Sequence, residues 1–278
     1  MKRTKIIFSI FAVFIILLGG LVLGSCSDGK HALAQELIQA LKDDDLIKME
    51  ELLKKGADPN IATSIFQKNI FAQTLAKFPF YEACSANNLK AVELMLEYGA
   101  NPNLAPKHYN LTALGSVCYY GEMNENKFEI VKILVENGAN INQVNNSGST
   151  PLAAILKYPA FDQTNEIFFY LIERGANIKI EEMDLILFSS GNYNNAALDY
   201  LLAKGTDINA KNNLGKTALI YLVLRYSPNR DESKKHLEMI SYVLERGANK
   251  NMKDNDGKTA LDYASETGNS ELIELFTV

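Results

Sequence analysis

The phrase GADPN at residues 56–60 returns five more times along the chain, and these copies decide the fold. The other copies are GANPN at 99–103, GANIN at 138–142, GANIK at 175–179, GTDIN at 205–209 and GANKN at 247–251. Each copy follows an apolar stretch with helical spacing, as Ile240, Val243 and Leu244 show before Gly247. Glycine at that place readily adopts the positive φ that ends a helix. The chain is therefore predicted to be an array of repeated helical units.

A second phrase marks where the units begin. Its copies are TALGS at 112–116, TPLAA at 150–154, TALIY at 217–221 and TALDYA at 259–264. The Thr hydroxyl can cap free N–H groups at a helix start, and Pro is well tolerated at the first helical position. Together the two phrases resemble the ankyrin repeat, a unit of about 33 residues with a TPLHxA first helix and a GADxN ending. Insertions into this frame explain the uneven spacing of the glycines.

This resemblance covers residues 31–278 and implies an all-α ankyrin-repeat solenoid of about seven helix-turn-helix units with short hairpin tips. The sequence departs from the family pattern at the His of TPLH and in the fifth unit, which starts near Glu181 without a TPL phrase. The residues that replace the His are Tyr81, Gly115, Ala153, Ile220 and Asp262. In the first unit, Ile47, Leu52 and Leu53 are expected to form the apolar face of the second helix.

Several loops are longer than the ankyrin frame requires. Residues 61–77 lengthen the tip after the first unit, and their apolar side chains either fold back on the array or form an exposed contact. Those side chains are Ile65, Phe66, Ile70 and Phe71. Polar insertions near 122–126, 159–163 and 227–235 separate the two helices of three units. Equivalent loops would stack into a ridge on one edge, although tolerated random insertion explains them equally well.

The first 25 residues form a separate segment. Residues 1–5 are basic and residues 6–23 are apolar, which is typical of a secretory signal. Leu23, Gly24 and Ser25 before Cys26 resemble the lipobox of bacterial lipoproteins, which implies cleavage before Cys26 and a lipid on its sulfur. The alternative is an uncleaved transmembrane anchor, because residues 6–23 are just long enough to span a bilayer.

The domain boundaries follow from this N-terminal pattern. We expect a signal peptide over 1–25, a tether over 26–30 and the ankyrin-repeat domain over 31–278. Both the lipid anchor and the transmembrane anchor place the repeats outside the cytoplasm, because the basic end stays inside. In a Gram-negative host, the lipid on Cys26 would hold the protein at the periplasmic face of the outer membrane.

The charge balance argues against nucleic acid as a partner. The chain has 28 basic and 33 acidic side chains, a net charge of -5. Loss of Lys2, Arg3 and Lys5 with the signal leaves 25 basic side chains against 33 acidic ones, a charge of -8. An acidic array favours a protein partner with a basic surface through long-range attraction, unless the charges are simply solvated outer faces.

Two patterns that suggest ligand chemistry do not support it. LGKT at 214–217 and DGKT at 256–259 resemble the end of a P-loop, but Ala210 and Met252 stand where the phosphate cradle requires glycine. A calcium loop around Asp254 and Asp256 would put Met252 and Tyr263 at the first and last ligand positions. Both stretches fit hairpin tips, where Asp and Asn bond to their own backbone.

No catalytic or metal site is predicted elsewhere. His31, His108 and His236 fall in different units, with no Cys or His at ligand spacing. We expect no metal, no cofactor, no small-molecule substrate and no enzymatic activity. Cys84 and Cys118 occupy equivalent places in adjacent units, where helices lie about 8 to 10 Å apart. A disulfide needs Cα atoms within about 7 Å, so both are predicted to be buried free thiols.

The ankyrin resemblance implies a protein–protein interaction module that binds through its inner helices and hairpin tips. Two positions close each inner helix on the concave side, and here they are Ser85, Ala86, Tyr119, Tyr120, Lys157, Tyr158, Leu224, Arg225, Glu266 and Thr267. Tyrosine and arginine often anchor interfaces. We therefore expect a partner to contact Tyr119, Tyr120, Lys157, Tyr158, Leu224 and Arg225, with Val144, Asn146, Lys211, Asn213, Lys253 and Asn255 as a polar rim. Alternatively, Tyr119 and Tyr158 simply cover the edges of the core.

A more specific hypothesis combines the anchor with the binding surface. The protein would be an inhibitor or immunity protein that binds and blocks an envelope-targeted toxin or enzyme. This hypothesis rests on analogy with bacterial ankyrin lipoproteins encoded beside such effectors. The alternative is an envelope scaffold or assembly factor.

Overall fold

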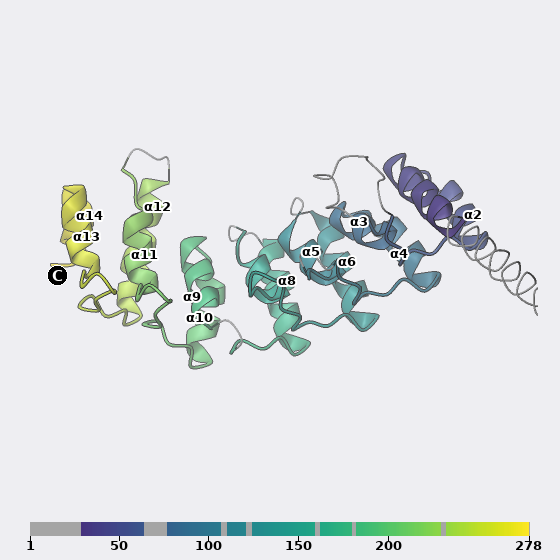
Figure 1. Cartoon of the computed structure of the whole chain (residues 1–278). Coiled ribbons are helices and arrows are strands. Elements are labelled where there is room, and N and C mark those ends of the chain that lie inside the picture. The colour runs from purple at the N-terminus through teal and green to yellow at the C-terminus, as the bar shows by residue number, and fades with distance from the viewer. Residues whose placement is uncertain are drawn as a thin grey trace, which may run out of the picture.

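The helices of this chain stand in pairs along a single row, from α2 (Leu46–Lys54) at one end to α14 (Ser270–Glu274) at the other, as seen in the computed structural model (Figure 1). The structure describes residues 29–63, 77–106, 110–120, 124–158, 162–179, 182–228 and 232–277. Within these ranges the only β pairing is a single antiparallel bridge between Thr63 and Lys77. The predicted all-α repeat array is confirmed.

Seven helix pairs account for the described chain, and we number these units in chain order. The first, inner helices are residues 29–42, α3 (Pro79–Ser85), α5 (Ala113–Tyr119), α7 (Pro151–Ile155), α9 (Glu182–Gly191), α11 (Ala218–Arg225) and α13 (Ala260–Thr267). The second, outer helices are α2, α4 (Leu89–Glu97), α6 (Glu125–Glu136), α8 (Asp162–Glu173), α10 (Asn195–Ala203), α12 (Ser233–Glu245) and α14. Inner helices from α3 to α13 pack on the inner helices of neighbouring units, and outer helices from α2 to α10 pack on outer ones.

The inner helices begin where the TPL-like phrases predict. Thr112, Thr150, Thr217 and Thr259 are N-cap residues, and each hydroxyl accepts a hydrogen bond from the N–H three residues later. Unit 2 has Phe78 as N-cap without a side-chain bond, and Pro79 follows as the first helical residue. The fifth unit forms α9 although it lacks the phrase. Local capping is therefore helpful but dispensable for an inner helix that packs between two neighbours.

The glycines of the repeated phrase end the outer helices with positive φ, as predicted. Their φ values run from 81° at Gly99 to 96° at Gly175. The third residue of every phrase, Asp or Asn, then accepts a hydrogen bond from the N–H two residues later, which closes a tight Asx turn. One short phrase thus ends a helix and turns the chain toward the next unit.

The last asparagine of the phrase connects neighbouring units, and we call these contacts the asparagine ladder. Its side-chain amide donates to the carbonyl of the next unit's glycine, and its side-chain oxygen accepts from the N–H two residues beyond that glycine. The rungs run from Asn60 to Gly99 and Asn101 (3.0 and 2.7 Å), from Asn103 to Gly138 and Asn140 (2.9 and 2.7 Å), from Asn142 to Gly175 and Asn177 (3.1 and 2.8 Å), and from Asn209 to Gly247 and Asn249 (3.3 and 2.7 Å).

The ladder changes at the junction between units 4 and 5. There the phrase ends in Lys179, and a lysine amine can donate hydrogen bonds but cannot accept one. Other contacts cross this junction. The Asn192 side-chain amide donates to the Leu156 carbonyl over 2.8 Å, and the Tyr200 ring lies edge-on to Phe169, with centroids 5.5 Å apart.

Burial in the core confirms the prediction for two cysteines and contradicts the prediction for one apolar residue. Cys84 and Cys118 are fully buried free thiols, and burial raises the pKa of Cys118 to about 12. Ile47 is 76% exposed, so its expected place on the apolar face of α2 is wrong. Met49, Leu52 and Leu53 form the buried stripe, and Ile47 lies on the opposite side of the helix from them.

Some predicted features lie outside the described residues. These are the segment 1–25 with Cys26, the apolar side chains Ile65, Phe66, Ile70 and Phe71, and parts of the inserted loops. The base of the first insertion is visible, because the backbones of Thr63 and Lys77 bond to each other over 2.8 and 3.2 Å. In the described part of the chain, every helix is too short or too polar to cross a bilayer.

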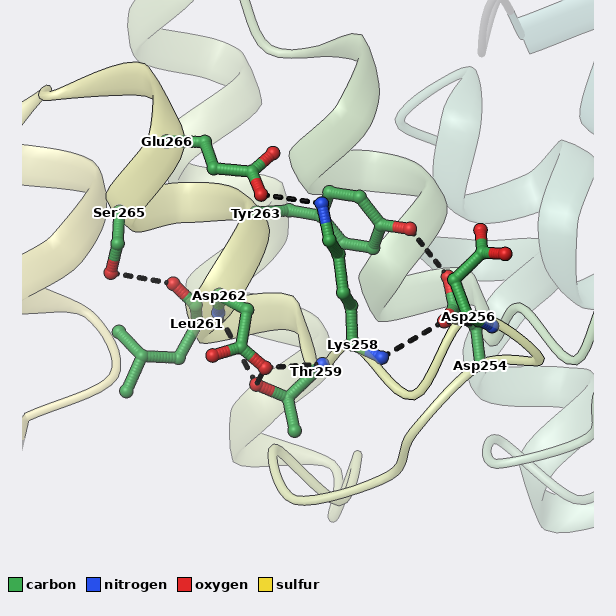
Figure 2. Close-up of polar contacts among 9 residues, drawn as sticks. All are labelled: Asp254, Asp256, Lys258, Thr259, Leu261, Asp262, Tyr263, Ser265 and Glu266. Carbon is green, nitrogen blue, oxygen red and sulfur yellow. Dashed lines mark hydrogen bonds and ion pairs between the residues drawn. The ribbon is translucent and has the colours of Figure 1, made fainter.

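In the hairpin tip before α13, a carboxylate bonds to the backbone of the turn, as the sequence predicts (Figure 2). Asp254 accepts hydrogen bonds from the N–H groups of Asp256 and Lys258 and from the Tyr263 hydroxyl, over 3.0, 3.1 and 2.6 Å. Thr259 and Asp262 form a capping box at the helix start. These contacts, led by the Tyr263 hydroxyl, hold the pKa of Asp254 below its usual value. The Asp254 carboxylate thus stabilises the turn.

The free energy of unfolding should depend on pH in the acid range through the ionisation of Asp254. Its lowered folded-state pKa stabilises the fold above the unfolded pKa of about 3.9, and this contribution is lost as pH falls through the folded value. Asp254→Asn should keep the turn, because Asn145 and Asn212 accept the same pair of backbone bonds in their tips. Urea midpoints should differ between parent and variant at pH 6, and the difference should shrink progressively as pH falls below about 3.9. A difference that does not change with pH would contradict this role.

The asparagine ladder predicts the effect of a second substitution. Asn103→Ala removes two hydrogen bonds between units 2 and 3, so unfolding should become easier by about 1 to 2 kcal/mol. The matched control is Asn137→Ala, because the Asn137 amide bonds only to Ile133 of its own helix. Urea denaturation followed by circular dichroism measures both. An equal loss in the two variants would show that the ladder adds nothing beyond local helix ends.

Candidate functional site

The candidate surface is formed by side chains at the ends of four consecutive inner helices. They are the fourth, seventh and eighth residues after the N-cap in units 3, 4 and 6, and their counterparts on α9. We call this set the central strip, and its members are Ser116, Tyr119, Tyr120, Ala154, Lys157, Tyr158, Phe188, Gly191, Asn192, Tyr221, Leu224 and Arg225. Ser116, Ala154 and Gly191 are buried, so the other members form the accessible part of the strip. Their helices α5, α7, α9 and α11 pack on one another in this order, so equivalent positions on them should follow one another along the array. The helices of the row are seen in Figure 1.

Tyr119 and Tyr120 form an exposed aromatic pair at the end of α5. Their side chains are 39% and 43% exposed, and the rings meet edge to face with centroids 4.8 Å apart. An aromatic pair in this geometry is favourable, so each ring limits the freedom of the other. The helix end therefore presents a large apolar surface that is already ordered.

Lys157 lies between aromatic rings of the two neighbouring units. Its Nζ is 4.7 Å from the centre of the Tyr119 ring and 5.1 Å from the centre of the Phe188 ring. Both distances are within the range of a cation–π interaction. The contacts hold the ammonium group over the strip and connect units 3, 4 and 5.

Tyr158 is half-buried and holds Tyr119 in place. Its hydroxyl donates to the Tyr119 backbone carbonyl over 2.8 Å, and the Nζ of Lys127 lies 4.3 Å from its ring centre. Lys127 is fully buried beneath the strip, and burial lowers its pKa. Tyr158 therefore acts as a positioning residue within the predicted set, and its aromatic face is already covered by Lys127.

Leu224 and Arg225 form the end of the strip on α11. Leu224 is 44% exposed. A Nη atom of Arg225 lies 3.2 Å from the point where a Cβ of Gly191 would be. The absence of a side chain at Gly191 thus lets the guanidinium lie against the backbone of α9 in the preceding unit.

The expected rim residues fall into two separate places. Val144 and Asn146 lie at the tip of unit 4, where the Val144 carbonyl accepts a bond from Asn110 over 3.0 Å. The other four join the tips of units 6 and 7. The Lys211 amine donates to the Lys253 carbonyl over 2.7 Å, and the Asn255 amide donates to the Asn213 carbonyl over 3.1 Å. These four residues are exposed, but they also contribute to the packing of adjacent tips.

Sequence reasoning missed the three strip residues at α9, the mid-helix members Ser116, Ala154 and Tyr221, and Lys127 beneath the strip. Phe188 and Gly191 belong to unit 5, which lacks the phrase that sets the frame in its neighbours. Counting back from Gly205 by the offset that separates Ser85 from Gly99 would have found Gly191. Lys127 gave no signal, because lysines at the start of an outer helix are usually solvated.

A second, smaller surface lies on the outer helices of the first two units. A shallow groove between α2 and α4 is lined by Leu46, Ile47, Glu50, Lys90, Glu93, Leu94 and Glu97. It includes the exposed Ile47 and carries more acidic than basic side chains. The described residues contain no group of His, Cys, Asp and Glu side chains that could hold a metal ion.

Comparison with known proteins agrees with this architecture. The family model for ankyrin repeats (3 copies) matches residues 37–145, 80–182 and 185–277. A putative ankyrin repeat protein of Acanthamoeba polyphaga mimivirus is 29% identical over 200 residues, which cover 68% of this chain and 34% of the relative. One of Fowlpox virus (strain NVSL) is 26% identical over 185 residues, 66% of this chain and 24% of the relative. The chain thus matches about a third or less of the length of these curated relatives.

A solved structure shows the same fold. It is the Bd0816 predatory endopeptidase from Bdellovibrio bacteriovorus in complex with immunity protein Bd3460, and the match is 24% identical with a TM-score of 0.56. The aligned part covers 71% of this chain and 96% of the matching one. The family match extends over nearly all of the described helices. The chain therefore belongs to the ankyrin-repeat family, whose members are generally non-catalytic modules that bind other proteins.

Proposed function

We propose that this protein is a membrane-tethered, extracytoplasmic module that binds and blocks an envelope-targeted enzyme or toxin, as an inhibitor or immunity protein. The observation that carries the proposal is the exposed, ordered cluster of Tyr119, Tyr120 and Lys157 on the concave side. Aromatic side chains in fixed positions bind with little further loss of entropy. The ankyrin fold is compatible with the role, since a chain of this fold occurs in the Bdellovibrio endopeptidase–immunity protein complex.

The tether is supported by the sequence of residues 1–26. A basic start, an apolar run and LGSC are together typical of a lipoprotein signal, with Cys26 as the lipid acceptor. In a Gram-negative host this would hold the repeats at the periplasmic face of the outer membrane. A tethered binder stays at high local concentration in the space that it protects.

The anchor can be tested independently of the partner. Cys26→Ser should abolish labelling of the protein by an alkyne fatty-acid probe and leave the unprocessed precursor. Ser27→Ala leaves the acceptor sulfur intact and serves as the control. If Cys26→Ser retains the label, the lipid acceptor is another residue and this part of the proposal is wrong.

The binding surface should be tested with the partner that co-purifies with the full chain from host membranes. Tyr119→Ala and Tyr120→Ala should each weaken binding by about 2 kcal/mol, roughly thirtyfold, because both rings are exposed anchor candidates. The outer-helix variants Lys132→Ala and Glu173→Ala should leave the affinity unchanged. Affinity is measured by calorimetry, after circular dichroism has shown that each variant is folded.

Two results would decide against the proposal. If outer-helix changes weaken binding and the tyrosine changes do not, the partner uses the convex side. If the partner is an enzyme whose activity is unaffected when saturated with the protein, the role is that of a scaffold rather than an inhibitor.

A further inference from the structure

The central strip has a charge opposite to that of the chain as a whole. The chain has a net charge of -5, yet the strip contains Lys157 and Arg225 and no carboxylate. The nearest equivalent positions with carboxylates are Glu82 in unit 2 and Glu266 in unit 7. Both are paired within the protein, with Lys77 at 2.9 Å and with Lys258 at 2.5 Å. The middle of the concave side is therefore locally cationic.

Both cations reach toward α9 from opposite sides. Lys157 extends from unit 4 to the Phe188 ring, 5.1 Å away. Arg225 extends from unit 6 to Gly191, with a Nη atom 3.2 Å from the Cβ position. Phe188 and Gly191 are three residues apart, so they lie on the same face of the helix. The two charges thus border one face of α9.

The residues of α9 do not neutralise the two cations. Gly191 is buried beneath the Arg225 guanidinium and the Tyr221 ring, and the Asn192 amide is turned to the Leu156 carbonyl over 2.8 Å. Within the part of the chain that the structure describes, neither Lys157 nor Arg225 forms an ion pair. Their charges are therefore available to an incoming group.

We propose that this face of α9, between Lys157 and Arg225, binds an acidic segment of the partner protein in which carboxylates alternate with apolar side chains. A carboxylate can accept two parallel hydrogen bonds from the Arg225 guanidinium, and another can pair with the Lys157 ammonium. Apolar neighbours would contact Tyr119, Tyr120 and Leu224. This inference rests on the proposed function, because it names the partner chemistry for the same concave surface.

The peptide selectivity proposed for the strip is opposite to the selectivity expected from net charge, so one selection experiment distinguishes the two. Net charge predicts that this acidic protein selects basic peptides, whereas the strip predicts acidic ones. The probe is a random twelve-residue peptide display library, selected on the full chain in detergent at about 0.15 M salt. The selected peptides should be enriched in Asp and Glu next to Leu, Phe or Tyr, relative to the unselected library.

Variants then locate the binding site of the selected peptides. Lys157→Met and Arg225→Met remove the charges and keep most of the side-chain volume. Each substitution should lower the affinity for the enriched peptides about tenfold. In the double variant, this affinity should lose most of its dependence on salt concentration. The matched control Lys132→Met, on the outer helix α6, should bind as the parent does. Fluorescence anisotropy with labelled peptides gives the affinities.

Several outcomes would overturn the inference. They are selection of basic or uncharged peptides, equal binding of acidic peptides to parent and double variant, and failure to select any peptide that depends on Lys157 or Arg225. These outcomes are separate from those of the proposed function. A partner that loses affinity with Tyr119→Ala but not with Lys157→Met would leave concave binding intact and reject only the acidic segment.

Discussion

The asparagine ladder is the contact that sets the register at four junctions of the array. A hairpin at the end of each unit leaves a glycine carbonyl and a nearby N–H without helical partners, and such groups must be bonded in a packed structure. Asn103 meets both groups of the following unit with one side chain. Because the amide has a fixed geometry, it sets the offset between units as well as their contact. The backbone N–H of Asn103 also donates to the Asn101 side chain and so closes the Asx turn of its own unit, so local and long-range order agree.

Register explains how a concave surface arises from short, ordinary helices. Once the units are aligned, equivalent helix ends follow one another, and side chains two units apart can approach the same helix. Lys157 and Arg225 meet α9 in this way. The junction between units 4 and 5 is also where the ladder has Lys179 in place of asparagine. The cross-unit contact of Lys157 with Phe188 therefore connects units 4 and 5 at the junction with the altered rung.

The sequence predicted the fold well because its information is repeated. Six phrases fix helix ends and turns, four of them also supply a rung, and the glycine φ values follow them. The threonine caps follow the TPL-like phrases. The site was predicted only in part. Tyr119 and Tyr120 could be placed by counting from a clear cap, whereas α9 has no such start and its Phe188 was missed. Burial of Lys127 depends on packing around its helix, which periodicity does not resolve at single residues. Exposure of Ile47, in contrast, follows from the helical period once Met49 and Leu52 are taken as the buried side.

Net charge is a poor guide to the partner of an extended array. At physiological salt, charges separated by more than about 8 Å are largely screened. Inner and outer helices are themselves about 8 to 10 Å apart, so carboxylates on the outer faces of α4 and α6 act weakly on the concave side. A ligand at α9 therefore responds mainly to Lys157 and Arg225, which flank it directly. Overall charge influences the encounter at low salt, whereas contact chemistry is set unit by unit along the strip.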